Sequence, residues 1–191
     1  MTETPHRPEQ LQALDYLRRA GSEAPVASIR KRAAATFAEI EELLAGLDQS
    51  VARKRPAAGK WSVQEVVDHL VESHRPAVDD VARLIAGEDV AEAVPASLQS
   101  ADPHGWDWPE RRADLAAVHR DLLAHLDGAD DTTPQQAKTP VVMVVKCATE
   151  GGGVEAVEWV DHFGWKASAL LIRVHTLEHT GQVRRVLEAV G

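Results

Sequence analysis

Much of the chain places apolar residues three and four positions apart, with polar residues between them. Side chains at that spacing lie on one face of an α-helix, so each such run predicts a helix with one buried stripe. Four long helices are predicted, over residues 26–47, 63–86, 109–127 and 163–189. A shorter helix is predicted to begin near Pro8 and to end at Gly21.

Residues typical of helix starts mark where three of the long helices begin. Ser62 followed three residues later by Glu65 is the pattern of a capping box, and Trp61 directly before it can pack on the first turn. Pro109 suits the first turn of the third long helix, because a first-turn residue needs no N–H partner. Asp161 is predicted to cap the last helix.

The pattern changes before the last helix. Residues 140–147 and 154–160 are rich in valine, which favours strands, and Gly151–Gly153 separates them. These segments predict an antiparallel hairpin packed on the helices, because two strands alone are only marginally stable. The expected fold is therefore an all-α four-helix bundle with a small β-hairpin inserted before the last helix, in one domain over residues 1–191.

The connection from residue 87 to residue 108 shows no period. A loop of this length in a compact domain is usually functional or partly disordered. Trp106 and Trp108 are expected to cover an apolar region, with the mouth of a site as one alternative.

Composition removes several classes of function. The net charge is −9, which argues against a general surface for nucleic acid or anionic lipid. No run of 18 apolar residues is present, so no membrane-spanning helix is expected. Cys147 is the only cysteine, which excludes an internal disulfide. With no signal-peptide pattern at the N-terminus, a cytoplasmic location is expected.

The chemistry of the chain is concentrated in its histidines. His175 and His179 are four residues apart and lie on one face of the last helix, and His69 lies in the second long helix. Three imidazoles can share one metal ion and leave coordination positions open, as in catalytic zinc sites. The alternative is that they are unrelated helix residues. His74 is expected to be packed or hydrogen-bonded rather than a ligand.

Further polar residues flank these histidines. His119 and His125 are expected at the helix surface, without a metal role. Gln182 lies two turns beyond His175 and shares its face, where it could orient a ligand or a substrate. Four acidic residues could hold an outer imidazole N–H or act as a base, although solvated helix carboxylates are common: Glu65, Asp68, Glu72 and Glu178.

A helix starting with Trp61-Ser62 and carrying His69, followed by a last helix with His175-x-x-x-His179-x-x-Gln182, resembles the DinB-like (YfiT-like) superfamily of metal-binding four-helix bundles. The resemblance implies a divalent metal ion, zinc or nickel, held by the three histidines. Relatives in that superfamily include thiol S-transferases that use bacillithiol or mycothiol, and a mycothiol-dependent maleylpyruvate isomerase.

Three functions are open at this stage. The first is a metal-dependent thiol S-transferase or thiol-dependent isomerase acting on a small molecule. An arginine-rich composition, typical of GC-rich genomes, fits mycothiol better than bacillithiol. The second is a metal-dependent hydrolase, and the third a non-catalytic, stress-related metal-binding protein. Oligomeric state is left open, with a homodimer as one alternative. The glycines at 151–153 lack the lysine of a phosphate loop, and no Gly-x-Ser-x-Gly elbow is present.

Overall fold

A computed structural model describes residues 6–191 of the chain. Its helices and strands follow in the order α1 (Pro8–Glu23), α2 (Val26–Leu44), α3 (Gln49–Ala52), α4 (Val63–Ile85), α5 (Trp108–Asp127), β1 (Thr139–Ala148), β2 (Val154–Phe163) and α6 (Trp165–Val190). None of these helices is long and apolar enough to cross a membrane.

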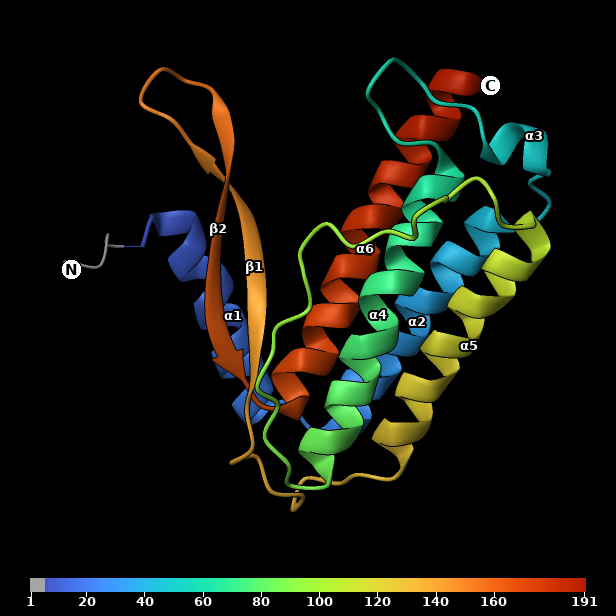
Figure 1. Cartoon of the computed structure of the whole chain (residues 1–191). Coiled ribbons are helices and arrows are strands. Elements are labelled where there is room, and N and C mark those ends of the chain that lie inside the picture. Colours follow the sequence, from blue (N-terminus) through green and yellow to red (C-terminus); the bar gives the residue numbers. More distant parts are fainter. Residues whose placement is uncertain (1–5) are drawn as a thin grey trace.

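The four long helices α2, α4, α5 and α6 lie side by side as a bundle, with α1 and the hairpin to one side (Figure 1). α4 packs on both α5 and α6, and α2 packs on the same two helices from the opposite side. The expected four-helix bundle with a hairpin before its last helix is confirmed. The predicted helix over 26–47 ends earlier, at Leu44.

The start of α4 is fixed as expected from its sequence. The Ser62 hydroxyl accepts a hydrogen bond from the Glu65 amide at 3.2 Å, and the Glu65 carboxylate accepts one from the Ser62 amide at 2.8 Å. This capping box satisfies two amides that a helix start leaves without partners. It also fixes which residues of α4 face the neighbouring helices.

The start of α6 differs from the prediction. Strand β2 continues to Phe163, and Gly164 is the residue before the first helical turn. Asp161, expected to be the helix cap, instead lies in the strand and accepts a hydrogen bond from Arg18 of α1 at 2.8 Å. An aspartate is well suited to cap a helix, but Asp161 lies in the strand, three residues before the actual cap position at Gly164.

The hairpin is an antiparallel pair that runs from Thr139↔Phe163 at its root to Ala148↔Val154 at its turn. Both predicted strands are confirmed, and each is longer than expected. Met143 and Cys147 are buried on the face toward α1, and Phe163 at the root is buried as well. The hairpin and α1 therefore support each other at the side of the bundle.

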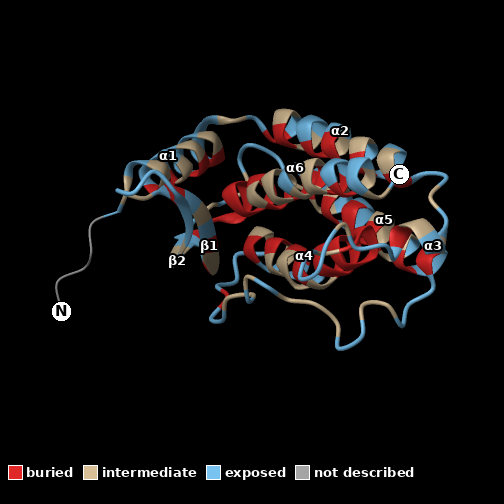
Figure 2. Cartoon of the chain, turned by 90° about the horizontal axis from the view of Figure 1, so that it is seen from above, coloured by how far each residue is buried: buried red, intermediate tan, exposed pale blue. Residues whose placement is uncertain are grey.

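The buried faces of the helices point toward one another, as Figure 2 shows from the end of the bundle. One apolar cluster joins α1, α2, α4, α5, α6 and the hairpin, and includes Ile29, Phe37 and Trp165. A second cluster joins α2, α4, α5 and α6, and includes Ile40, Val66 and Trp108. Burial of this apolar surface is the main force that positions α4 against α6.

Candidate metal centre

Three histidines meet where α4 packs on α6. His69 Nε2 lies 3.1 Å from His175 Nε2, which lies 3.0 Å from His179 Nε2. One nitrogen from each of the three rings lies within 4.8 Å of the others, so this group could hold a metal ion. Imidazole nitrogens bound to one zinc ion at about 2.0–2.1 Å are roughly 3–3.4 Å apart, which matches these distances.

The local structure of α6 holds two of these rings in place. His175 and His179 are one turn apart, and their rings lie nearly at right angles with centroids 4.5 Å apart. Thr176 and Thr180, on a neighbouring face, are fully buried and donate their hydroxyls to the carbonyls of Ile172 and Thr176 in the same helix. Burial of this face orients α6 about its axis.

The outer nitrogens of two rings have partners that decide where their protons lie. His69 Nδ1 is 2.8 Å from the Leu98 carbonyl oxygen, and His179 Nδ1 is 2.8 Å from Gln182 Oε1. Carbonyl and amide oxygens only accept, so each Nδ1 must carry the proton and donate it. The Nε2 atoms of His69 and His179 therefore present lone pairs to the centre of the group.

His175 lies between these two acceptors. Its Nδ1 is 3.0 Å from His74 Nε2, and its Nε2 faces both His69 and His179. A neutral imidazole has one N–H, so His175 can serve at most one of its two Nε2 neighbours. If it donates from Nδ1 to His74, three lone pairs converge. A shared cation is the partner that satisfies all three.

Burial keeps these rings neutral. It lowers the pKa of His69, and it holds the pKa of His175 well below its usual range, with His179 and His69 adding to the effect. The pKa of His179 falls to about 4, through burial first and then through its neighbours, among them Lys146 of β1. Metal ions bind the neutral imidazole, so the group is in its ligating form at neutral pH.

An aromatic side chain forms one wall of the group. The Trp61 ring lies 5.2 Å from the His69 ring and 6.4 Å from the His179 ring. Trp61 precedes the Ser62 cap, so the start of α4 also positions this ring. The wall limits the access of water to one side of the nitrogens.

The acidic residues near His69 have other partners. Glu65 binds its own helix start and Arg55, while Asp68 and Glu72 both accept from Arg111 at 2.5 Å. The sequence-based idea that one of them holds an outer imidazole nitrogen is wrong. A backbone carbonyl, a histidine and a glutamine do so instead.

The three other histidines of the long helices differ from one another. His74 is buried and hydrogen-bonded to His175, as expected, and lies outside the three-histidine group. His119 was expected at the helix surface but is 1% exposed, with its ring stacked on Phe37 at 3.8 Å. Neither of its nitrogens has a partner among the described residues. His125 is half-buried.

The two tryptophans of the long loop also have definite places. Trp108 is 1% exposed and donates to the Leu47 carbonyl at 2.8 Å, so it fills the bundle core and does not border the histidines. Trp106 is 40% exposed and lies 4.8 Å from the Arg111 guanidinium carbon. The alternative that this pair covers a site mouth is therefore wrong for Trp108.

Two partners of His69 were missing from the sequence-based prediction. Ser73 Oγ lies 3.2 Å from His69 Nδ1, and its position four residues later on the same helix could have indicated it. The Leu98 carbonyl is a backbone atom, so no side-chain pattern marks it.

Comparison with protein families identifies a match. A family model described as the DinB superfamily matches residues 11–159. That span includes His69 and ends inside β2, before His175 and His179. A search of the curated proteins found no match.

Proposed function

The chain belongs to the DinB superfamily, and from this premise we propose that it is a divalent-metal-dependent enzyme whose ion is held by His69, His175 and His179. The proposed activity is that of a thiol S-transferase or a thiol-dependent isomerase. The thiol is of the mycothiol or bacillithiol type.

One observation carries the metal part of this proposal. Three neutral imidazoles, one buried and two half-buried, direct Nε2 atoms at one another at 3.0 and 3.1 Å, and two of these atoms are acceptors. Such a contact is unfavourable without a cation, because buried acceptors need partners. Zinc and nickel both accept imidazole nitrogen, so the residues fit either ion.

When bound, such an ion would supply a positive charge with open coordination positions, which favours the thiolate form of a thiol substrate. The protein residues do the rest. Leu98 and Gln182 hold the rings of His69 and His179 in the tautomer that directs Nε2 inward, and His74 would do so for His175 by accepting its Nδ1–H. The Trp61 ring, which lies beside His69 and His179, would limit the access of water to that side of the site.

The placement of the carboxylates supports a thiol reaction over hydrolysis. A hydrolase with this ion would need a nearby carboxylate as its general base. Asp68 and Glu72 are instead paired with Arg111, and Glu65 with Arg55. A thiol that ionises at the metal needs no such base.

Metal analysis followed by turnover assays tests the proposal. Purified protein should contain about one zinc or nickel ion per chain. It should then catalyse loss of an electrophile, such as an alkyl halide or maleylpyruvate, only when mycothiol or bacillithiol is present. Turnover of an ester without thiol would favour the hydrolase. Bound metal without any turnover would favour the binding protein.

A further inference from the structure

A cleft lies beside the histidine group, between α4, α6, the hairpin root and the loop after α4. It consists of two cavities, of about 60 Å³ and about 450 Å³. Asp80 and Val94 line both cavities, so the two adjoin. The larger has the volume of a small-molecule site, commonly about 300–1,000 Å³.

The cleft begins about one helical turn from the histidines. Ala77, in the smaller cavity, is three residues after His74, and Ile172 is three residues before His175. Three residues of helix rise about 4.5 Å. Leu98, whose carbonyl contacts His69, lines the larger cavity.

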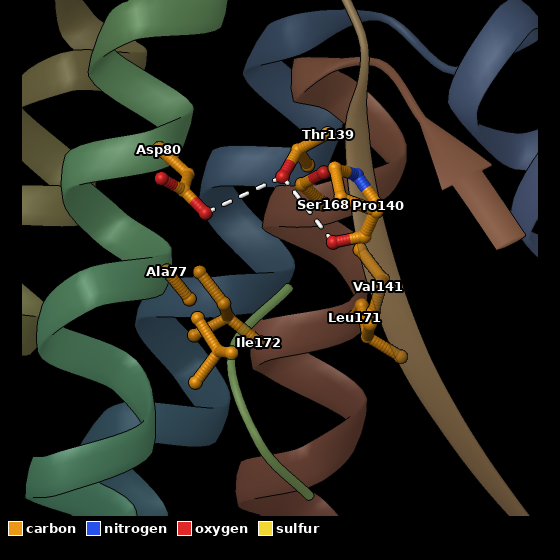
Figure 3. A pocket seen from close by; sticks show the side chains of 9 residues that line it. Ala77, Asp80, Thr139, Pro140, Val141, Ser168, Leu171 and Ile172 are labelled. Carbon is orange, nitrogen blue, oxygen red and sulfur yellow. Dashed lines mark hydrogen bonds between the residues drawn. The ribbon is translucent and has the colours of Figure 1, made fainter. Parts of the chain in front are cut away.

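Asp80 is the charged residue that both cavities share. Its side chain points from α4 across the smaller cavity toward Thr139, whose hydroxyl donates to it at 3.3 Å (Figure 3). Among residues 6–191 no cationic side chain forms an ion pair with Asp80. Arg83, one turn further along, lies against Glu88 at 3.5 Å and donates to the Asp89 carbonyl.

The rest of the smaller cavity is mostly apolar, with one more polar group, whereas Arg83 and Glu92 also line the larger cavity. Ala77, Leu171 and Ile172 supply carbon surface. Ser168 is 6% exposed, and its hydroxyl has no hydrogen-bond partner in the described part of the chain. Burial also raises the pKa of Asp80, against the opposing effects of Thr139 and Arg83.

We propose that this cleft binds the primary ammonium group of a small organic molecule, with the Asp80 carboxylate as its counter-ion. An ammonium group has three N–H donors, which match Asp80 and the hydroxyl oxygens of Thr139 and Ser168. Its carbon skeleton lies against the apolar lining.

Other ligand classes fit less well. In the smaller cavity an anion would be repelled by Asp80, because Arg83 lines only the larger cavity and pairs with Glu88. A neutral apolar molecule would leave the carboxylate without a strong partner. Calcium needs six to eight oxygen ligands, and magnesium an octahedron of oxygens, far more than the one carboxylate here supplies. That the ammonium group belongs to the substrate handled at the three histidines rests on the proposed function. Its binding at Asp80 does not.

Titration with n-propylammonium chloride, followed by amide chemical shifts, tests the site. Saturable shifts are expected at Ala77, Thr139 and Leu171, and n-propanol and sodium propionate at equal ionic strength should produce none. Asp80→Asn keeps the size of the side chain but removes its charge, and should weaken binding about tenfold or more. The adjacent, exposed Asp79 provides the matched control, and Asp79→Asn should bind as the parent does.

Thr139→Val gives a second measurement if Asp80→Asn does not fold, and should also weaken binding. Shifts that do not saturate, that n-propanol reproduces, or that survive both Asp80→Asn and Thr139→Val would overturn the site. The titration is repeated on His175→Ala with EDTA. Ammonium binding there, with no metal bound by the parent, refutes the proposed function alone. Metal binding by the parent without ammonium binding refutes the cleft alone.

Discussion

Helix α4 carries two buried polar groups on neighbouring faces, and they are built differently. Toward α5, Asp68 and Glu72 each accept from Arg111 at 2.5 Å, and Asp114 accepts a third bond at 3.2 Å. Toward α6, His69 meets other imidazole nitrogens at close range. We call the first the arginine cluster and the second the histidine cluster.

Donors match acceptors in the arginine cluster. Burial alone would lower the pKa of Arg111, but hydrogen bonds to Glu72 and Asp68 raise it above its usual value. Of its nitrogens only Nε lacks a partner among the described residues. In the histidine cluster, acceptors face acceptors. Burial therefore does not identify a site on its own, and the mismatch between donors and acceptors does.

The two clusters are connected through the loop. Asp68 also accepts from the Ser100 amide and hydroxyl, both at 2.8 Å. Ser100 is two residues after Leu98, whose carbonyl contacts His69. The arginine cluster thus holds in place the loop segment whose Leu98 carbonyl orients the His69 ring of the histidine cluster.

The largest effect is expected when the histidine cluster is broken at its centre. His175 contacts both other rings, so His175→Ala should lower bound metal from about one ion per chain to well below one and abolish thiol-dependent turnover. Metal analysis after dialysis measures this. His125→Ala, at a half-buried helix position outside the cluster, is the control and should retain metal. Metal binding by His175→Ala equal to the parent would show that the three-histidine site is wrong.

Breaking the arginine cluster should affect stability instead. Arg111→Met leaves the buried Asp68 carboxylate and the half-buried Glu72 carboxylate without their cation, and should lower the free energy of unfolding by about 3–5 kcal/mol. Urea unfolding measures this. Arg75→Met removes an exposed ion pair with Asp114 at 3.7 Å and should cost less than about 1 kcal/mol. Metal content of folded Arg111→Met at saturating metal should stay near that of the parent. If Arg111→Met instead lost its metal and kept the stability of the parent, the arginine cluster would serve metal binding and not stability.

A smaller effect is expected from Gln182, which holds one ring of the histidine cluster from outside. Gln182→Ala removes the acceptor 2.8 Å from His179 Nδ1 and should weaken metal affinity about 10–100-fold, without changing stoichiometry. Competition with a chelator of known affinity measures this. Gln182→Glu keeps an acceptor and should restore most of the affinity. Equal affinity in all three proteins would show that Gln182 is not a positioning residue.

The sequence predicted the parts of this comparison that depend on spacing. Helical period gave the bundle, and the four-residue spacing of His175 and His179 put both on one face of α6. It did not predict the contact made by the Leu98 carbonyl, because backbone atoms carry no residue type. It also could not distinguish Asp68, buried against Arg111, from a solvated helix carboxylate. That difference depends on which helix packs there.

The smallest effect concerns His119, whose buried imidazole belongs to neither cluster. Its ring lies against Phe37 in the core, 5.6 Å from the ring of His74, and both its nitrogens lack partners among residues 6–191. His119→Phe keeps an aromatic ring and removes two unsatisfied polar atoms, so it should stabilise the fold by about 1 kcal/mol at pH 8. Thermal unfolding measures this, and His125→Phe is the control.

The pH dependence of that difference gives the sharper test. Burial lowers the pKa of His119 to about 3 in the folded chain, against 6.5 for an ordinary histidine. Above pH 6.5 both states are neutral, and the group contributes no pH dependence. Below it the unfolded chain binds a proton that the folded chain does not, so the parent loses stability as the pH falls toward 3. The stability gain of His119→Phe should therefore grow from pH 7 to pH 5. His74, whose pKa His119 helps to lower, is held well below its usual range mainly by burial. A constant gain over that range would mean that the His119 ring is hydrated or partnered in solution.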